Sequence, residues 1–182
     1  MKSGHIARSA WAVALAFGLA AGGVAACATE PPPKVADVKA ADMPDGETWD
    51  GVYFHPVFGY LHLLDNGTSV AGKWKRSDQS KWGELTGTKV GNVVHFEWKE
   101  HTYGLVGPAA ETHGKGVFVY SVEEVNAHKT GKLAGKFGLM DDEIGSTWDC
   151  TKQVGMKPKP DSITGDQSAT GAPAAAGRWD EK

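Results

Sequence analysis

The chain has 182 residues, enough for one domain with additional segments, and its 19 Lys and Arg against 22 Asp and Glu give a formal net charge of −3. This charge excludes the strongly basic class of nucleic-acid-binding proteins. The 24 glycines and seven tryptophans favour short strands and tight turns over helices, and two cysteines, Cys27 and Cys150, exclude a framework of several disulfides.

Residues 1–26 have the composition of a signal peptide for export. Lys2 and Arg8 precede an uncharged run, residues 10–26, that is rich in alanine and glycine. A basic start, an apolar run and an end of small residues are typical of a secretory signal. The alternative is a membrane-spanning anchor, for which this run is short and weakly apolar.

The residues Val24-Ala25-Ala26-Cys27 resemble the lipobox of bacterial lipoproteins, in which an aliphatic and two small residues precede a cysteine. The resemblance implies cleavage between Ala26 and Cys27 and acylation of Cys27, and two or more acyl chains anchor a protein stably in a membrane. Because Ala28, and not Asp, follows the cysteine, the sequence resembles the lipoproteins that are sorted to the outer membrane. The alternative is ordinary cleavage after Ala28, which would release a soluble secreted or periplasmic protein.

Two segments flank the body of the chain. Residues 27–46 contain three consecutive prolines, alternating charges and no aromatic residue. Because such a composition cannot bury enough surface to fold, we expect an extended tether between membrane and body. Residues 154–182 have a similar composition and are expected to form a disordered tail, with Trp179 as their only aromatic residue.

The body, residues 47–153, shows a period of two in its apolar residues and no convincing period of 3.6. The alternation is clearest in 70–75, 92–99 and 132–137, and it is typical of an antiparallel sheet with one buried face. The pattern predicts strands over 49–55, 59–64, 68–75, 81–86, 92–99, 115–121, 131–138 and 144–152. One helical turn is allowed within 122–130.

The turns indicate how these strands connect. Asp65-Asn66-Gly67 supplies the Asn-Gly pair that tight hairpins prefer. Short sequential strands indicate an up-and-down meander, and closure would remove its exposed edges. We therefore predict an all-β fold, an antiparallel eight-stranded small barrel. A membrane-spanning barrel is the rival, but it needs strands of about nine to eleven residues with an apolar outer face.

The predicted architecture resembles the calycin-like barrels, the lipocalins and avidins. Trp49-Asp50-Gly51-Val52-Tyr53 is similar to the opening tryptophan of those families, although their Gly-x-Trp order is absent. Val94-His95-Phe96-Glu97-Trp98-Lys99 is similar to a tryptophan-bearing avidin strand. The resemblance concerns architecture and implies no particular binding residue.

No sequence pattern of catalysis or metal binding is found. GxSxG, P-loop and dinucleotide motifs are absent, and Asp141-Asp142-Glu143 lacks the spacing of a calcium loop. Cys150 is interpreted as a buried, inert thiol. We expect no enzymatic activity, no metal and no cofactor. The histidines after the signal peptide lack the paired spacing of zinc ligands: His55, His62, His95, His101, His113 and His128.

The functional potential lies in aromatic side chains that we expect to point into the barrel: Tyr53, Trp74, Phe96, Trp98, Phe137 and Trp148. An eight-stranded barrel is just wide enough to be filled by side chains or to hold one small ligand. Two functions follow. In the first, the barrel binds a small apolar molecule or an envelope lipid, with Trp74 and Trp98 at its mouth. In the second, the core is filled and the lipoprotein has a structural role or binds an envelope protein.

Overall fold

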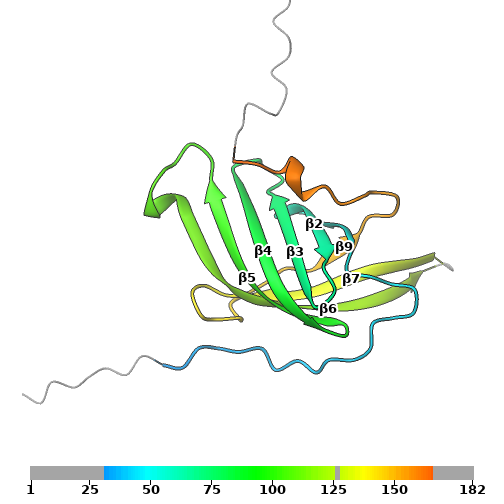
Figure 1. Ribbon diagram of the computed structural model, residues 1–182. Coiled ribbons are helices and arrows are strands. Elements are labelled where there is room, and N and C mark those ends of the chain that lie inside the picture. The colour runs from blue at the N-terminus through cyan, green and yellow to red at the C-terminus, as the bar shows by residue number, and fades with distance from the viewer. Residues whose placement is uncertain (1–30, 126–127, 166–182) are drawn as a thin grey trace, which may run out of the picture. The chain divides into compact units, whose positions relative to one another are not determined.

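The computed structural model describes residues 31–125 and 128–165, and nearly all of its regular structure is antiparallel sheet (Figure 1). The strands are β1 (Gly51–His55), β2 (Gly59–Asp65), β3 (Ser69–Lys75), β4 (Lys81–Val90), β5 (Val93–Thr102), β6 (Glu111–Val125), β7 (His128–Phe137), β8 (Ser146–Thr147) and β9 (Cys150–Lys152). Short 3-10 turns lie at Pro108–Ala110 (η1) and Pro160–Ser162 (η2). In these described ranges, no helix is long and apolar enough to cross a membrane.

The strands close into a ring, which confirms the predicted all-β fold and eight-stranded barrel. From β1 to β7 each strand pairs with the next, and β9 completes the ring between β7 and β1. The two residues of β8 pair with β7 outside this ring. Apolar side chains alternate inward and charged ones outward, the reverse of the pattern in a membrane-spanning barrel.

The longest hairpin, β6–β7, extends beyond the ring at one end, where Figure 1 draws it in yellow-green and yellow. Its outer part pairs Val122 with Gly131 and continues to Val125 opposite His128. The helical turn considered within 122–130 is therefore wrong for the described residues of that range. Valine has a higher propensity for strands than for helices, and the cross-strand pairing satisfies the backbone polar groups here.

Aromatic and aliphatic side chains fill the interior of the barrel. The rings need space, and glycines on neighbouring strands supply it. A Cβ atom on Gly83 would lie 2.2 Å from the Trp74 ring, and one on Gly116 would lie 2.5 Å from the Phe96 ring. The space beside Gly72 is occupied by Leu63. The high glycine content is thus partly a consequence of packing large rings in a narrow barrel.

The N-terminal segment lies along the outside of the barrel. Residues 31–46 contain no helix or strand, yet Ala36 and Val38 pack against Val93 and Val117 on the outer face of β5 and β6. We call residues 34–43 the strap; it is the blue to cyan segment in Figure 1. The expectation of a free tether over 27–46 therefore does not hold for the strap. Composition alone does not reveal that its small apolar residues match an apolar strip on two strands.

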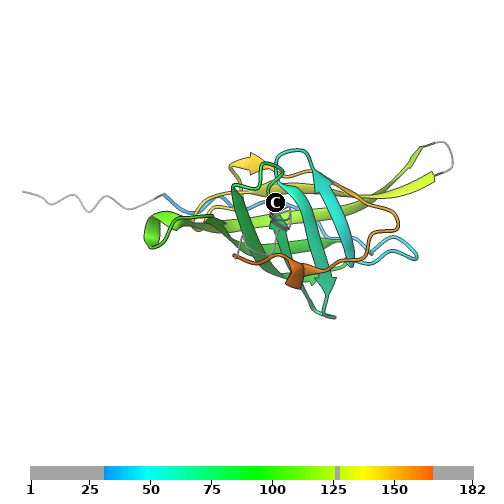
Figure 2. The same ribbon diagram turned by 90° about the horizontal axis from the view of Figure 1, so that it is seen from above.

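The C-terminal segment also contacts the barrel over its described part, residues 154–165. The Lys159 N–H donates to His62 Nδ1 at 2.9 Å, the Tyr103 hydroxyl donates to the carbonyl of Thr164 at 2.9 Å, and Ile163 is buried. Figure 2 shows this orange segment crossing beside the strands. The remainder of the expected tail, including Trp179, lies outside the described residues, as do the signal peptide and Cys27.

Candidate functional site

Four of the six predicted aromatic residues gather around a fifth, Trp148. Its ring centroid lies 4.8 Å from that of Trp74, 6.2 Å from Phe96 and 6.0 Å from Phe137. Trp98 joins this group through Phe137, at 5.7 Å. Such spacings are those of rings in direct contact. The predicted inward positions are thus brought together, and they pack against one another.

Tyr53, the sixth predicted residue, lies toward the opposite end of the barrel. Its ring is 6.5 Å from that of Tyr120, and its hydroxyl donates to the carbonyl of Trp49 at 3.0 Å. Sequence reasoning missed several core rings, among them Phe58 and Phe118, which lie 4.9 and 5.4 Å from Trp148. Phe118 shares the period-two pattern of its strand, whereas Phe58 lies in a turn where no period could identify it.

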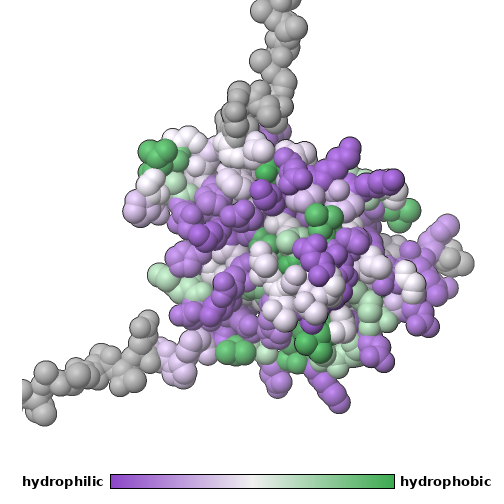
Figure 3. Space-filling view, viewed as in Figure 1, coloured by the Kyte–Doolittle hydropathy of each residue, from purple (hydrophilic) through white to green (hydrophobic). Residues whose placement is uncertain are grey.

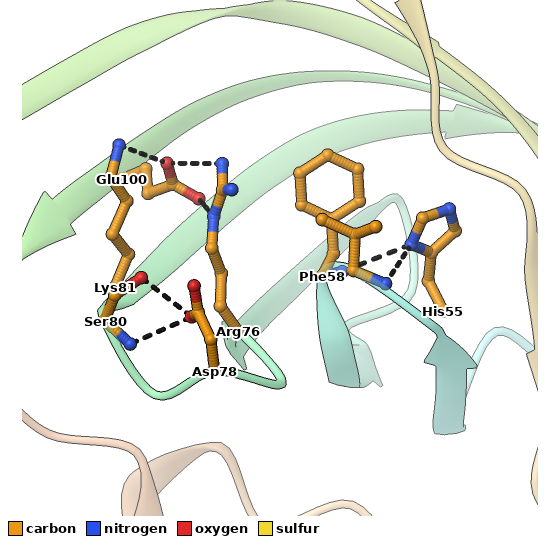
Figure 4. Close-up of polar contacts among 8 residues, drawn as sticks. His55, Phe58, Arg76, Asp78, Ser80, Lys81 and Glu100 are labelled. Atoms are coloured by element: carbon orange, nitrogen blue, oxygen red, sulfur yellow. Dashed lines mark hydrogen bonds and ion pairs between the residues drawn. The ribbon is translucent and has the colours of Figure 1, made fainter.

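An ion-pair network and Phe58 lie close together at one end of the barrel (Figure 4). Glu100 continues the inward row of β5 and is only 5% exposed. Arg76 binds both of its carboxylate oxygens, at 2.7 and 2.9 Å, and Lys81 Nζ lies 3.2 Å away. The Arg76 guanidinium also lies 5.1 Å from the Phe58 ring centroid. With two cations beside it, this carboxylate is a fully compensated structural group.

His55 holds the turn that carries Phe58. Its Nδ1 accepts the backbone N–H groups of Val57 and Phe58, both at 3.1 Å (Figure 4). An accepting Nδ1 requires the neutral ring with its proton on Nε2. Burial lowers the pKa of His55, which favours the same neutral form. The residue therefore acts as a turn-stabilising acceptor.

Glu47, Tyr120 and Lys152 lie together at the opposite end. The Tyr120 hydroxyl donates a short hydrogen bond to Glu47, and Lys152 Nζ lies 3.1 Å from the same carboxylate oxygen. Burial by itself would raise the pKa of Glu47, but the bonds from Tyr120 and Lys152 outweigh it and lower that pKa. Burial, and then the bond to Glu47, raise the pKa of Tyr120. At both ends, polar side chains thus satisfy each other.

Two indole N–H groups in the interior find no acceptor among the described residues, Trp74 Nε1 and Trp148 Nε1. Both nitrogens are fully buried, and their rings are in contact. A buried donor without a partner costs free energy unless a water or a ligand supplies an acceptor. Cys150 lies nearby as a buried thiol, and burial raises its pKa, which disfavours the reactive thiolate.

A groove of about 650 Å³ lies on the outer face of β3 to β6; we call it the outer groove. The strand register builds its floor from two rows of outward side chains. One row is Lys73, Glu84, Lys99 and His113, and the other is Ala71, Thr86, Glu97 and Lys115. Met140 and Asp141 flank it on one side, and Pro160 and Asp161 contribute from the C-terminal segment.

The charges of the outer groove are only partly compensated within the described chain. Lys115 pairs with Asp141 at 2.9 Å, and Lys99 lies 3.5 Å from Glu111. The side chains of Glu84, Glu97 and Asp161 make no hydrogen bond or ion pair with residues 31–125 and 128–165, although lysines lie beside Glu84 and Glu97 in the strand register. Figure 3 shows hydrophilic residues over much of the barrel surface, interrupted by separate apolar spots. The groove therefore presents lysines and carboxylates side by side, and three of the carboxylates make no direct ion pair within the described residues.

The histidines are dispersed over the barrel. His95 pairs with Glu143 at 2.8 Å, and His101 stacks on Trp82 with ring centroids 4.4 Å apart. Within the part of the chain that the structure describes, no group of three or more His, Cys, Asp or Glu side chains could hold a metal ion.

Comparisons with known proteins give no relative for this chain: no family model, no curated protein and no solved structure matches it.

Proposed function

We propose that the protein is a lipid-anchored protein of the cell envelope, at the outer membrane, whose filled barrel binds a partner protein through the outer groove. The observation that carries this proposal is the contrast between the interior and the outer face. Inside, rings pack at contact distance, whereas the outer groove holds about 650 Å³ of open space. A filled core with an exposed, charged groove favours recognition at the surface over storage of a ligand inside.

The groove also indicates the chemistry of the partner. Among the described residues, its carboxylates without a direct ion pair are Glu84, Glu97 and Asp161, while Lys99 and Lys115 already have acidic partners. A polypeptide segment with basic side chains would complement this arrangement. No nucleic acid is expected, because its phosphates would be repelled by the same carboxylates.

Site-specific photocrosslinking in the native envelope tests the groove. A photoreactive residue at Thr86, exposed on the groove floor, should capture a protein, and Glu84→Gln with Glu97→Gln should reduce the yield. The matched control is the same residue at Ala134, which is exposed on the outer face of β7. An equal crosslinking yield from both positions, or a yield at Thr86 that Glu84→Gln with Glu97→Gln leaves unchanged, would contradict the proposed role of the groove.

The anchor is tested separately, through Cys27. The Val24–Cys27 motif supports acylation, and the intact mass of the purified protein should include the acyl groups. Cys27→Ala should remove this added mass and shift the protein from the membrane to the soluble fraction. An unchanged mass and an unchanged membrane partition would contradict the lipoprotein proposal.

A second candidate function is supported by the two indole donors without an acceptor, Trp74 Nε1 and Trp148 Nε1. A small, largely apolar molecule with one hydrogen-bond acceptor would satisfy them from within the barrel. Native mass spectrometry of the protein purified from its own membrane tests this candidate. A bound molecule that is lost in Trp148→Phe would support it, and a mass equal to that of the acylated chain alone would oppose it.

A further inference from the structure

The strap limits how far the barrel can stand from the membrane; this inference rests on the lipid anchor proposed at Cys27. Among the described residues of the N-terminal segment, which begin at residue 31, the first that bonds to the barrel is Lys34. Its N–H donates to Asp142 Oδ1 at 2.8 Å, and its carbonyl accepts the Glu143 N–H at 2.8 Å. From Cys27 to Lys34 the chain makes seven residue steps. Even fully extended, that length spans about 25 Å.

Beyond Lys34, the strap is bound to the barrel at several further points, so it does not add to the length of the tether. The Ala36 N–H donates to the Glu143 carboxylate at 2.9 Å in a buried contact. Farther along, Ala41 and Asn92 exchange two hydrogen bonds, at 2.8 and 2.9 Å. The apolar contacts of Ala36 and Val38 lie between these points. A long flexible tether is thereby replaced by a short one that ends at a defined place on the barrel.

The same place presents an apolar turn. Asp142 and Glu143, which bind the strap, are separated by Asp141 alone from Leu139 and Met140, whose exposures are 60% and 68%. The turn is held by the Met140 N–H, which donates to the carbonyl of His113 at 3.1 Å, and by the Asp142 N–H, which donates to that of Leu139 at 3.1 Å. A single exposed apolar residue is common on a protein surface and needs no explanation. Here two adjacent ones lie at the point where the short tether reaches the barrel.

We propose that the turn 138–142 faces the membrane that carries the acyl chains of Cys27, and that Leu139 and Met140 insert into its phospholipid interface. The chain length keeps this turn within reach of the membrane surface, and burial of two apolar side chains among lipid favours the contact. Because Met140 and Asp141 also flank the outer groove, the groove opens beside the membrane. A partner bound there would lie close to the lipid surface.

Depth-dependent fluorescence quenching tests this orientation. The acylated full-length protein is placed in vesicles of phosphatidylethanolamine and phosphatidylglycerol, with an environment-sensitive dye on Met140→Cys or, in a second variant, Leu139→Cys. The matched controls are Val106→Cys and Val154→Cys, at residues that are 95% and 88% exposed. The unsubstituted protein is the labelling blank, because Cys150 is buried.

We expect a blue shift and quenching by spin-labelled lipids at positions 139 and 140, and neither effect at 106 and 154. Vesicle-bound protein without quenching at 139 and 140, or with equal quenching at all four positions, would overturn the orientation and leave the anchor intact. If the protein purified from its own membrane carries no acyl groups and does not bind vesicles, the anchor is overturned and, with it, this inference. The two failures are therefore distinguishable.

Discussion

Replacing Trp74 with alanine tests whether the barrel interior is a packed core. The Trp74 side chain is 2% exposed, its ring lies 4.8 Å from that of Trp148, and it faces the bare backbone of Gly83. Because glycine has no side chain that could move into the vacated space, the cavity would collapse only partly. We therefore expect a loss of about 3–5 kcal/mol in the free energy of unfolding. The total free energy of unfolding of domains of this size is about 5–15 kcal/mol.

The matched control is Trp82→Ala, on the adjacent strand β4. Trp82 is half-buried and stacks on His101 on the outer face, with ring centroids 4.4 Å apart. Removing its ring loses this stacking contact, and we expect the free energy of unfolding to fall by about 1 kcal/mol. Urea unfolding followed by far-ultraviolet circular dichroism gives both values without relying on tryptophan fluorescence. In thermal scans, Trp74→Ala should lower the midpoint by about 10–20 °C.

Equal losses in the free energy of unfolding for Trp74→Ala and Trp82→Ala would refute this reasoning. A cost of about 1 kcal/mol for Trp74→Ala would mean that its ring is not part of a close-packed core. In that case the interior would have room that the packing described above does not allow, and the second candidate function would gain support.

Three further predictions concern the space beside Trp74, the ion pairs of Glu100 and the C-terminal segment. Gly83→Ala should destabilise the barrel by about 1–3 kcal/mol in urea unfolding, because its Cβ would lie 2.2 Å from Trp74; Gly145→Ala, whose Cβ would be 3.3 Å from its nearest neighbour, should cost much less. Glu100→Gln should cost about 3 kcal/mol, since it leaves Arg76 and Lys81 beside a neutral group, whereas Glu84→Gln should change stability by less than about 0.5 kcal/mol. Burial lowers the pKa of His62, so the unfolded chain takes up the proton first. The stabilisation from neutral His62 is therefore present above the ordinary pKa of about 6.5 and is lost as pH falls from that value through the lower pKa of the folded protein. The Lys159 amide donates to His62 Nδ1. Its protection factor, which compares its hydrogen exchange with that of an unstructured chain at the same pH, should therefore fall between pH 7 and 5, and an unchanged protection factor would count against this bond.

The strands and turns follow from local properties of the sequence. Alternation over 70–75 and 92–99 places every second side chain on one face, and β3 and β5 form there. Asn66-Gly67 supplies a turn in which Gly67 has a φ of 85°. The predicted strand 144–152 is interrupted, and the reason is not local. The side chain of Asp149 accepts the Gly135 N–H at 3.0 Å, which replaces backbone pairing and separates β8 from β9.

The features proposed to carry function depend on contacts between distant parts of the chain. Glu143 binds Ala36 across 107 residues, and no periodicity in 27–46 indicates that the strap finds an apolar strip on β5 and β6. The rows of charge in the outer groove exist only because the register sets Glu84 beside Lys73 and Lys99. Sequence periodicity determines which side chains share a face, because it acts within one strand. Which strands meet, and what then covers or exposes that face, is decided by the burial of apolar surface across the whole molecule.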